Sequence, residues 1–390
     1  MSKHRNRRAA RVVAFGAAGA LTVAAGVTAV ASASQPATAT ATTCSFTRSD
    51  TSASTGDNPR HVVTGDLDGD GNADVVAADN SADSVSVLLG NGDGTFGTAT
   101  DYSVGDAPYQ TVIADFNADG NPDLATADFD GGTVSVLLGT GNGAFGAATE
   151  YTVGSGARAL VAGDVDGDGD LDVAVAEESA GRVSLLLGDG EGAFTVSSQT
   201  VTVTRPHGLV LTDFDGDGVL DLATASVATA GGVSVALGKG DGTFGDVTEY
   251  GSVARLYSLA QGDFDGDGST DLAAVSNGSD TLEIYAGNGD GTFQDPVDYT
   301  TSSLPVAVNT ADVNGDDLPD VLVSSLNGNS VEVYTGSSEG SVSELTELTE
   351  LSADGAYEAA AADVTSDGTT DLLVASSSDD AVDVFTGSCV

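Results

Sequence analysis

Short apolar runs alternate along this chain with polar, glycine-rich segments. In the first unit the runs are HVVTG at 61–65, VVAA at 75–78 and VSVLL at 85–89, and a fourth segment carries Tyr102. β-Branched runs separated by glycine turns predict short strands. The same succession occurs seven times in all, and a period near 50 residues is typical of propellers, solenoids and arrays. The pattern therefore predicts an all-β fold, a seven-bladed β-propeller with four-stranded blades.

An acidic segment of nine residues separates the first and second predicted strands of each unit. In DLDGDGNAD at 66–74, aspartates occupy positions 1, 3, 5 and 9, and Gly71 occupies position 6. Successive copies begin 49 to 51 residues apart, at Asp66, Asp115, Asp164, Asp213, Asp263, Asp312 and Asp363.

These segments have the ligand chemistry of a calcium site. Alternate spacing on a tight turn points the carboxylates inward, and Gly71 permits the left-handed backbone conformation that the turn needs. Hard oxygen donors, including the backbone carbonyl of position 7, suit calcium. Position 12 is Ala77 and a strand follows, which excludes an EF-hand. The alternative is a solvated acidic turn without an ion.

A calcium-binding loop is accordingly predicted in each blade, up to seven ions in all. The sixth loop replaces a carboxylate with Asn314 and a glycine with Asp317, and the seventh carries Thr365 and Ser366. We expect these two sites to be weaker, toward ~10⁻⁴–10⁻³ M, because ligand charge is lost. The predicted ligands are Asp66, Asp68, Asp70, Asn72, Asp74, Asp115, Asn117, Asp119, Asn121, Asp123, Asp164, Asp166, Asp168, Asp170, Asp172, Asp213, Asp215, Asp217, Val219, Asp221, Asp263, Asp265, Asp267, Ser269, Asp271, Asp312, Asn314, Asp316, Leu318, Asp320, Asp363, Thr365, Asp367, Thr369 and Asp371.

Glycine-rich segments of the form GxGxGxF follow the third predicted strand at 90–96, 139–145, 188–194, 238–244 and 287–293. Phosphate-binding loops open a helix, whereas these segments join two strands, so we exclude that function. We expect each phenylalanine to pack between blades. The strand that follows carries Tyr102, Tyr151, Tyr250 or Tyr299.

Net charge excludes one class of partner. The chain has 59 acidic and 12 basic residues, a formal charge of −47. Five of the basic residues fall within the first eleven positions, so the remainder carries 7 − 59 = −52. Such a body repels nucleic acid and anionic membranes. Hydrophobic residues still make up 40% of the chain at regular positions, which argues against a disordered acidic protein.

The N-terminal region predicts export. Residues 1–11 are basic, residues 12–30 are apolar, and Ala31, Ser32 and Ala33 form a small-residue cleavage site. We interpret 1–33 as a signal peptide and 34–43 as a flexible linker; a retained membrane anchor is the alternative. The prediction is a secreted, extracellular protein that is not inserted in a membrane after signal removal.

The propeller is predicted to span residues 44–390 and to close on itself. The seventh unit ends after its third strand, and CSFTRS at 44–49 is placed to supply the missing fourth strand. Cys44 and Cys389 lie at the two ends of the repeats, without the CxxC or histidine neighbours of a metal or catalytic cysteine. A disulfide between the ends is the simplest interpretation.

The acidic loops, their spacing and the glycine hairpins resemble the FG-GAP/VCBS repeats of integrin-α-type propellers over residues 44–390. The resemblance implies that each acidic loop joins the first two strands of a blade and holds calcium on the lower face. Members of that family include adhesion receptors, lectins and non-catalytic domains of secreted enzymes, so the resemblance names no ligand.

The turns before the inner strands would then face the opposite, upper end. Six of the seven residues lying six positions before each loop are basic or aromatic: Arg60, Tyr109, Arg158, His207, Tyr257 and Tyr357, with Val306 the exception. Arg205 and Arg255 lie in the same turns. We predict a ring that binds an anionic or hydroxyl-rich ligand. The alternative is packing over the axis. We expect Glu177 and Glu178 to form a solvated turn.

The sequence favours a non-catalytic binding or adhesion module for an extracellular protein or polysaccharide. An enzyme, such as a polysaccharide lyase or hydrolase, or a lectin acting through the upper face is the alternative. Only His61 and His207 are available as bases beyond the N-terminal region, and no nucleophile–base spacing is recognisable. The absence of tryptophan argues against a lectin.

Overall fold

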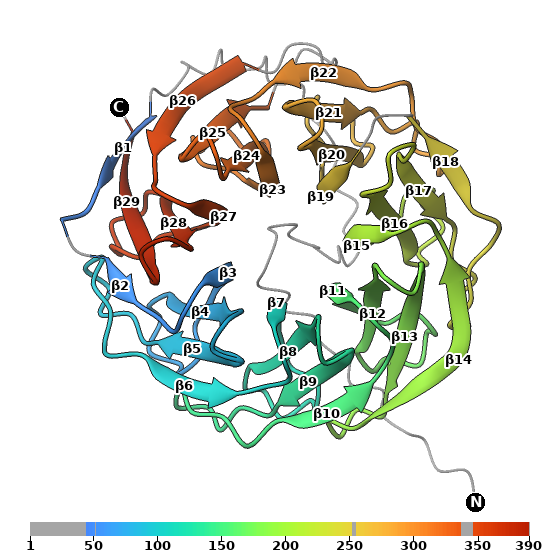
Figure 1. Ribbon diagram of the computed structural model, residues 1–390, viewed down its shortest axis with the longest axis horizontal. Coiled ribbons are helices and arrows are strands. Elements are labelled where there is room, and N and C mark those ends of the chain that lie inside the picture. Colours follow the sequence, from blue (N-terminus) through green and yellow to red (C-terminus); the bar gives the residue numbers. More distant parts are fainter. Residues whose placement is uncertain (1–43, 51, 252–254, 337–345, 390) are drawn as a thin grey trace, which may run out of the picture.

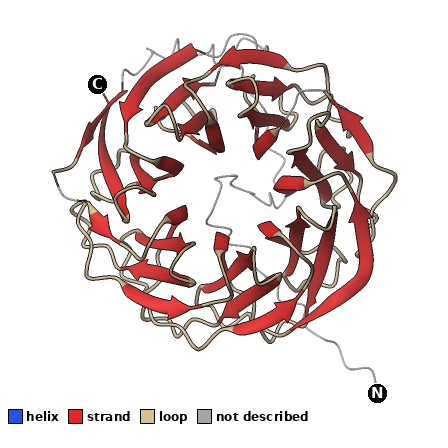
Figure 2. Ribbon diagram, viewed as in Figure 1, coloured by secondary structure: helices blue, strands red, loops and turns tan. Residues whose placement is uncertain are grey.

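The computed structural model describes residues 44–50, 52–251, 255–336 and 346–389, and all described elements are strands (Figures 1 and 2). Seven antiparallel sheets are arranged around a central axis, which confirms the predicted seven-bladed β-propeller. The predicted signal peptide, 1–33, and linker, 34–43, lie outside the described residues.

The blades follow one another in sequence order. Blade 1 contains β3 (Pro59–Gly65), β4 (Asp74–Asp79), β5 (Ser84–Leu88) and β6 (Thr100–Ser103); blade 2 contains β7 (Pro108–Ala114), β8 (Asp123–Asp128), β9 (Thr133–Leu137) and β10 (Thr149–Thr152). Blade 3 contains β11 (Ala157–Gly163), β12 (Asp172–Glu177), β13 (Arg182–Gly188) and β14 (Phe194–Thr202); blade 4 contains β15 (Pro206–Thr212), β16 (Asp221–Ser226), β17 (Val233–Ala236) and β18 (Thr248–Tyr250). Blade 5 contains β19 (Leu256–Gly262), β20 (Asp271–Ser276), β21 (Thr281–Tyr285) and β22 (Val297–Thr300); blade 6 contains β23 (Pro305–Ala311), β24 (Asp320–Ser325), β25 (Ser330–Thr335) and β26 (Thr346–Ser352). Blade 7 contains β27 (Ala356–Ala362), β28 (Asp371–Ser376) and β29 (Ala381–Cys389), joined by β1 (Cys44–Arg48) and β2 (Ala53–Ser54).

Each sheet is buried on both faces because it packs between two neighbours. All six residues of β4 are buried, which explains why the second strands read as continuous apolar runs. Val63 and Val76 of blade 1 form one cluster with Ile113 and Leu124 of blade 2. The core is therefore a set of apolar seams between adjacent blades.

The N-terminal strand closes the ring. β1 pairs antiparallel with β29, placing Cys44 directly opposite Cys389, and the two form the predicted disulfide. β2 continues along the same strand, with Ala53 opposite Val382. Residues from the two ends of the repeats thus build the outer part of blade 7 (Figure 1).

Aromatic rings from adjacent blades meet in the outer part of several seams. Tyr102 of blade 1 packs edge-on against Phe145 of blade 2, with ring centroids 5.6 Å apart. Its hydroxyl accepts a hydrogen bond from the amide of Phe145 at 3.2 Å. The prediction that the hairpin phenylalanines pack between blades is confirmed.

The described part of the chain contains no helix with the length and apolarity needed to cross a bilayer.

Candidate functional site

Each acidic loop joins the first strand of its blade to the second, as between β3 and β4. Positions 4 and 6 of the first loop, Gly69 and Gly71, have φ angles of 80° and 88°. A left-handed backbone at both positions turns the chain twice within the loop, and glycine adopts it without steric cost.

Aspartate side chains hold the loop backbone in place. Asp66 accepts hydrogen bonds from the amides of Gly69 at 2.7 Å and Gly71 at 3.1 Å. Asp68 accepts one from the amide of Asp70, and Asp70 one from the amide of Asn72. These short-range bonds turn the carboxylates of positions 1, 3 and 5 toward a common region.

The aspartate at position 9 also ties the loop to the hairpin of its own blade. One oxygen of Asp74 accepts from the amide of Leu67 and the other from the amide of Gly90, each at 2.7 Å. Burial, with the nearby charges of Asp68 and Asp70, raises the pKa of Asp74 to about 6 even though the two amide hydrogen bonds lower it. The same two backbone contacts recur at Asp123, Asp172, Asp221, Asp271, Asp320 and Asp371.

Four loops bring three carboxylates within 4.8 Å of one another: Asp66, Asp68 and Asp70; Asp164, Asp166 and Asp172; Asp213, Asp215 and Asp221; and Asp263, Asp265 and Asp271. They are the four loops that keep all four aspartates. Converging carboxylates repel one another unless a cation lies among them, and an all-oxygen donor set suits a hard divalent ion. The donor chemistry of these loops therefore fits calcium.

The other three loops are less favourable. Their third positions carry Asn117, Asn314 and Thr365. Left-handed positions filled by glycine elsewhere are occupied by Ala118, Asp317 and Ser366, with φ angles of 56°, 68° and 54°. Such a conformation costs a residue with a Cβ roughly 1–2 kcal/mol.

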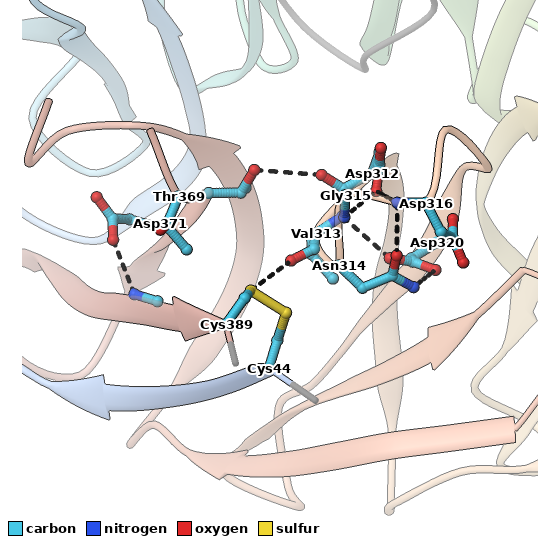
Figure 3. Close-up of a disulfide and its surroundings, with 12 residues drawn as sticks. Cys44, Asp312, Val313, Asn314, Gly315, Asp316, Asp320, Thr369, Asp371 and Cys389 are labelled. Atoms are coloured by element: carbon cyan, nitrogen blue, oxygen red, sulfur yellow. Dashed lines mark hydrogen bonds between the residues drawn. A yellow bond between two sulfur atoms is a disulfide. The ribbon is translucent and has the colours of Figure 1, made fainter. Parts of the chain in front are cut away.

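Four acidic loops also contact the next blade, namely those that begin at Asp66, Asp164, Asp213 and Asp363. The carbonyl oxygen of loop position 2 accepts a hydrogen bond from a hairpin glycine of the following blade, as from Gly143 to Leu67 at 3.0 Å. Between blades 6 and 7 the closing disulfide takes this place, with the Cys389 Sγ 3.9 Å from the carbonyl oxygen of Val313 (Figure 3). A rigid acidic loop therefore also stabilises the interface between its blade and the next one.

At the opposite, upper end, a β-bulge in every inner strand presents the predicted ring residues. Between β3 and β4 the register shifts between Pro59 and His61, so Arg60 is the extra residue. A bulge re-aims the side chain of its extra residue. Irregularities at the same place hold Tyr109, Arg158, His207, Tyr257, Val306 and Tyr357. In β15 the irregularity is wider, because both His207 and Gly208 lie between the paired residues Pro206 and Leu209.

The structure brings these side chains together. The guanidinium of Arg158 lies 3.9 Å from the ring centroid of Tyr109, and its Nη2 donates to the Tyr357 hydroxyl at 3.1 Å. Arg60 lies 4.4 Å from the ring centroid of Tyr357. Contacts between blades 3 and 7 cross the axis, so the upper ring covers this end of the propeller. The same contacts agree with the packing alternative.

His207 is buried at the side of the ring. Its Nδ1 lies close to the carbonyl oxygen of Tyr257 and 3.2 Å from the Nε of Arg158. The carbonyl contact requires a proton on Nδ1, so we assign that tautomer and treat the Arg158 approach as packing. Burial, with the positive charge of Arg158, lowers the pKa of His207 well below its usual range.

The predicted solvated turn at Glu177 and Glu178 is wrong. The Glu177 side chain is fully buried and accepts from the Nε of Arg182 at 2.6 Å, and Glu178 pairs with Arg205. Cations from neighbouring turns reach these carboxylates, and pairing makes their burial tolerable.

A second buried pair was missed. The Nε2 of His61 lies 3.3 Å from Oε1 of Glu358, which also accepts from Asn309 Nδ2 at 2.9 Å. Burial raises the pKa of Glu358 to about 8 and lowers that of His61 to about 3. Both follow a bulge residue directly, at equivalent positions of adjacent blades, and that equivalence was the available signal.

Solved structures similar to this chain share its fold. BBS1N from its complex with ARL6DN is 16% identical, with a TM-score of 0.61, over 87% of this chain and 96% of that one. Virginiamycin B lyase from Staphylococcus aureus is 13% identical, with a TM-score of 0.60, over 88% and 99%. A putative 6-phosphogluconolactonase from Bacteroides uniformis is 17% identical, with a TM-score of 0.58, over 77% and 87%. At these identities the likeness concerns the fold alone.

A search of curated proteins gave no match. The family model described as FG-GAP-like repeat matches six overlapping stretches, 66–126, 115–175, 164–224, 213–274, 263–323 and 312–374. Each stretch runs from the start of one acidic loop into the second strand of the next blade. The matches together span most of the propeller, and the chain belongs to the FG-GAP-like repeat family.

Proposed function

We propose that this protein is a secreted, calcium-binding propeller that acts as a non-catalytic binding or adhesion module. Its partner is an extracellular protein or polysaccharide with anionic or hydroxyl-rich groups. One observation carries the proposal: bulges in the inner strands turn two arginines and three tyrosines toward one end of a strongly acidic molecule.

The chemistry of that end favours such a ligand. Arg60, Tyr109, Arg158 and Tyr257 are partly exposed, although the guanidinium groups of Arg60 and Arg158 also pack on the tyrosine rings. Arg205 and Arg255 are exposed beside them. Guanidinium groups form paired hydrogen bonds with carboxylates and sulfates, and aromatic faces stack on sugar rings and cations.

Calcium would serve the fold rather than the reaction of a substrate. Asp213, Asp215 and Asp221, with their counterparts in the other loops, would hold the ion. A bound ion neutralises converging carboxylates and fixes the loop that contacts the next blade. The residues of the loop then keep the inner strands, and so the upper ring, in register.

An extracellular location is supported by two features. The Cys44–Cys389 disulfide persists in oxidising surroundings, and the first 33 residues have the composition of a signal peptide.

An enzyme or lectin using the same face is the second candidate. The specific observation is that His207 Nε2 lies 4.0 Å from Glu178 Oε2, beside Arg158 and Arg205. This pair could serve acid–base chemistry if a ligand displaced Arg205. Turnover of a bound polysaccharide that is lost in His207→Ala would establish the enzyme, and saturable binding without turnover would favour the module.

The deciding experiment measures binding to a panel of acidic and neutral polysaccharides and extracellular proteins in calcium. The test variant is Arg205→Gln/Arg255→Gln, which removes two exposed cations, one of them the partner of the largely buried Glu178; an unchanged Tm shows that the variant remains folded. The matched control is Lys239→Gln, an exposed cation on a hairpin at the lower end. We expect weaker binding only in the test variant. Equal binding by all three proteins would contradict an upper-face site.

A further inference from the structure

Three seams between blades are filled in the same way. A tyrosine of the outer strand packs edge-on against the hairpin phenylalanine of the next blade at Tyr102–Phe145, Tyr151–Phe194 and Tyr250–Phe293. The three phenylalanines are 9%, 8% and 7% exposed. Each tyrosine lies opposite an apolar residue of the third strand, as Tyr102 lies opposite Val85.

The seam between blades 3 and 4 lacks this tyrosine. In β14 the residue opposite Val183 is Val201, so valine occupies the tyrosine position. The hairpin phenylalanine of blade 4, Phe244, is only partly buried and packs against the cluster that contains Leu185 and Val201. This seam therefore lacks a large aromatic side chain, and no other side chain of the described residues takes its place.

A cavity of about 250 Å³ lies at this place, lined by Leu185, Val201, Phe244 and Val247 together with threonines of β14. The seam between blades 7 and 1 shows the same relationship. There Ala53 lies opposite Val382 in the tyrosine position, Phe96 is partly buried, and a cavity of about 230 Å³ adjoins both. In both seams a hollow therefore lies where the tyrosine side chain is missing.

The empty position also leaves a backbone amide without the phenol acceptor that is present in two of the three filled seams. The amides of Phe145 and Phe194 each donate to a tyrosine hydroxyl at 3.2 Å, whereas no such bond is found between Phe293 and Tyr250 among the described residues. No acceptor for the corresponding amide of Phe244 is found among the described residues. A phenol offers both the ring and the acceptor that this position lacks, whereas a phenylalanine ring offers only the first.

We propose that the hollow between blades 3 and 4 is a binding pocket for a tyrosine side chain of a partner polypeptide. The phenol ring would lie against Phe244 and Leu185, and its hydroxyl would accept from the Phe244 amide. Several residues that line the pocket belong to β14, which lies on the outer rim of the propeller (Figure 1), away from the inner strands that carry the upper ring. The pocket is therefore separate from the site of the proposed function.

The neighbouring strand favours a polypeptide over a free small molecule. The outer strands β6, β10, β18 and β22 are three or four residues long and each carries a carboxylate: Asp101, Glu150, Glu249 and Asp298. β14 has nine residues, FTVSSQTVT, and none is charged. On a chain of net charge −47, β14 itself therefore presents no charge to an extended segment, and Asp246 is the acidic residue among those that line the hollow.

The test uses the full chain in calcium and the peptide acetyl-Thr-Thr-Tyr-Thr-Thr-amide, with the alanine peptide and 4-methylphenol as comparisons. Binding is followed by amide and methyl NMR shifts of residues in the pocket. We expect the tyrosine peptide to shift the NMR signals of Val201, Phe244 and Val247. It should bind at least about tenfold more tightly than the alanine peptide or 4-methylphenol.

Two variants separate this pocket from nonspecific binding. Val201→Tyr supplies the phenol ring from the chain itself, so we expect a higher Tm. The variant should bind the tyrosine peptide at least about tenfold more weakly. Tyr151→Val empties the seam between blades 2 and 3 and should create a second site for the peptide. Equal binding of both peptides, or unchanged binding in Val201→Tyr, would overturn the proposal. Tighter binding of 4-methylphenol than of the tyrosine peptide would contradict a polypeptide partner and indicate a small phenol as the ligand.

Discussion

Arg48 and Asp383 form an ion pair that joins the first described strand to the last. The Nη2 of Arg48 lies 2.7 Å from Oδ2 of Asp383, whose side chain is 2% exposed and also accepts from the hydroxyl of Ser376. Arg48 therefore gives a buried carboxylate a positively charged hydrogen-bond donor at the point where the propeller closes. The side-chain contact therefore supplements β1–β29 pairing and the disulfide.

Replacing Arg48 with methionine should destabilise the protein by about 1–3 kcal/mol, because a buried carboxylate loses its charged partner. Urea unfolding measures the change. Arg182→Met is the matched control, since it removes the equivalent partner of Glu177 away from the closure. Both variants should lower stability, but only Arg48→Met should speed proteolysis within 44–50. Equal cleavage there in both would show that Arg48 has no special role in closure.

Breaking the disulfide should also open the ring at this point. Cys44→Ala/Cys389→Ala removes a cross-link between residues 345 apart, and losing a long-range disulfide costs roughly 2–5 kcal/mol. We expect a lower Tm, measured by calorimetry, and faster hydrogen exchange in β1 than in β3. Uniform exchange across both strands would mean that the closure does not open first.

Calcium removal should lower the Tm. A site filled at one hundred times its Kd contributes about 2.7 kcal/mol to the folded state, and the seven loops share the same backbone contacts. Melting of metal-stripped protein is compared in excess EGTA and in excess calcium. An identical Tm in both solutions would contradict the calcium assignment.

The loops should differ in affinity. Asp215→Asn removes a carboxylate from a loop in which three converge, whereas Asp367→Asn alters the seventh loop, where Thr365 already replaces one. Isothermal titration should lose one tight site in the first variant and none in the second. Asp246→Asn, an exposed acid outside the acidic loops, is the control. Loss of a tight site in Asp367→Asn would reverse the predicted order.

Stability should fall as pH rises when calcium is absent. Burial raises the pKa of Asp79 to about 7 despite hydrogen bonds from Ser86 and Gly56, and raises that of Glu283 to about 7. A raised folded-state pKa gives stability that is complete below the unfolded value, near 4, and is lost as pH passes the folded value. The slope for one such group is at most about 1.4 kcal/mol per pH unit.

Asp79→Asn isolates this effect. The Tm difference between Asp79→Asn and the original protein, measured in EGTA from pH 5 to pH 8, should move in favour of the variant as pH rises. A difference that stays constant over this range would show that Asp79 does not titrate near neutrality. Asp83→Asn, an exposed acid in the next turn, should give a flat difference.

Much of the architecture could be predicted from local pattern. The alternation of strands and loops and the left-handed glycines are set by residues close together in the sequence. Because the pattern recurs every 49–51 residues, each copy predicts the same local structure. The closing pair Cys44–Cys389 was recognisable because these are the only cysteines. The bulges that present Arg60 and its counterparts were not recognisable, since a bulge is defined by pairing with the next strand.

The sequence by itself determined the number of blades, the acidic loops and the residue types at the upper end. Tertiary structure decided which of those residues touch, as when Arg158 of blade 3 reaches Tyr357 of blade 7, and which seam is hollow beside Val201. It also showed that Asp79–Ser86 in blade 1 and Ser376–Asp383 in blade 7 are the same buried hydrogen-bonded pair with the two residue types exchanged. Local interactions determine each blade, so the repeat pattern is enough to predict it. Contacts across the axis form only when the propeller closes, and they join residues such as Arg158 and Tyr357 that occupy equivalent positions in different repeats.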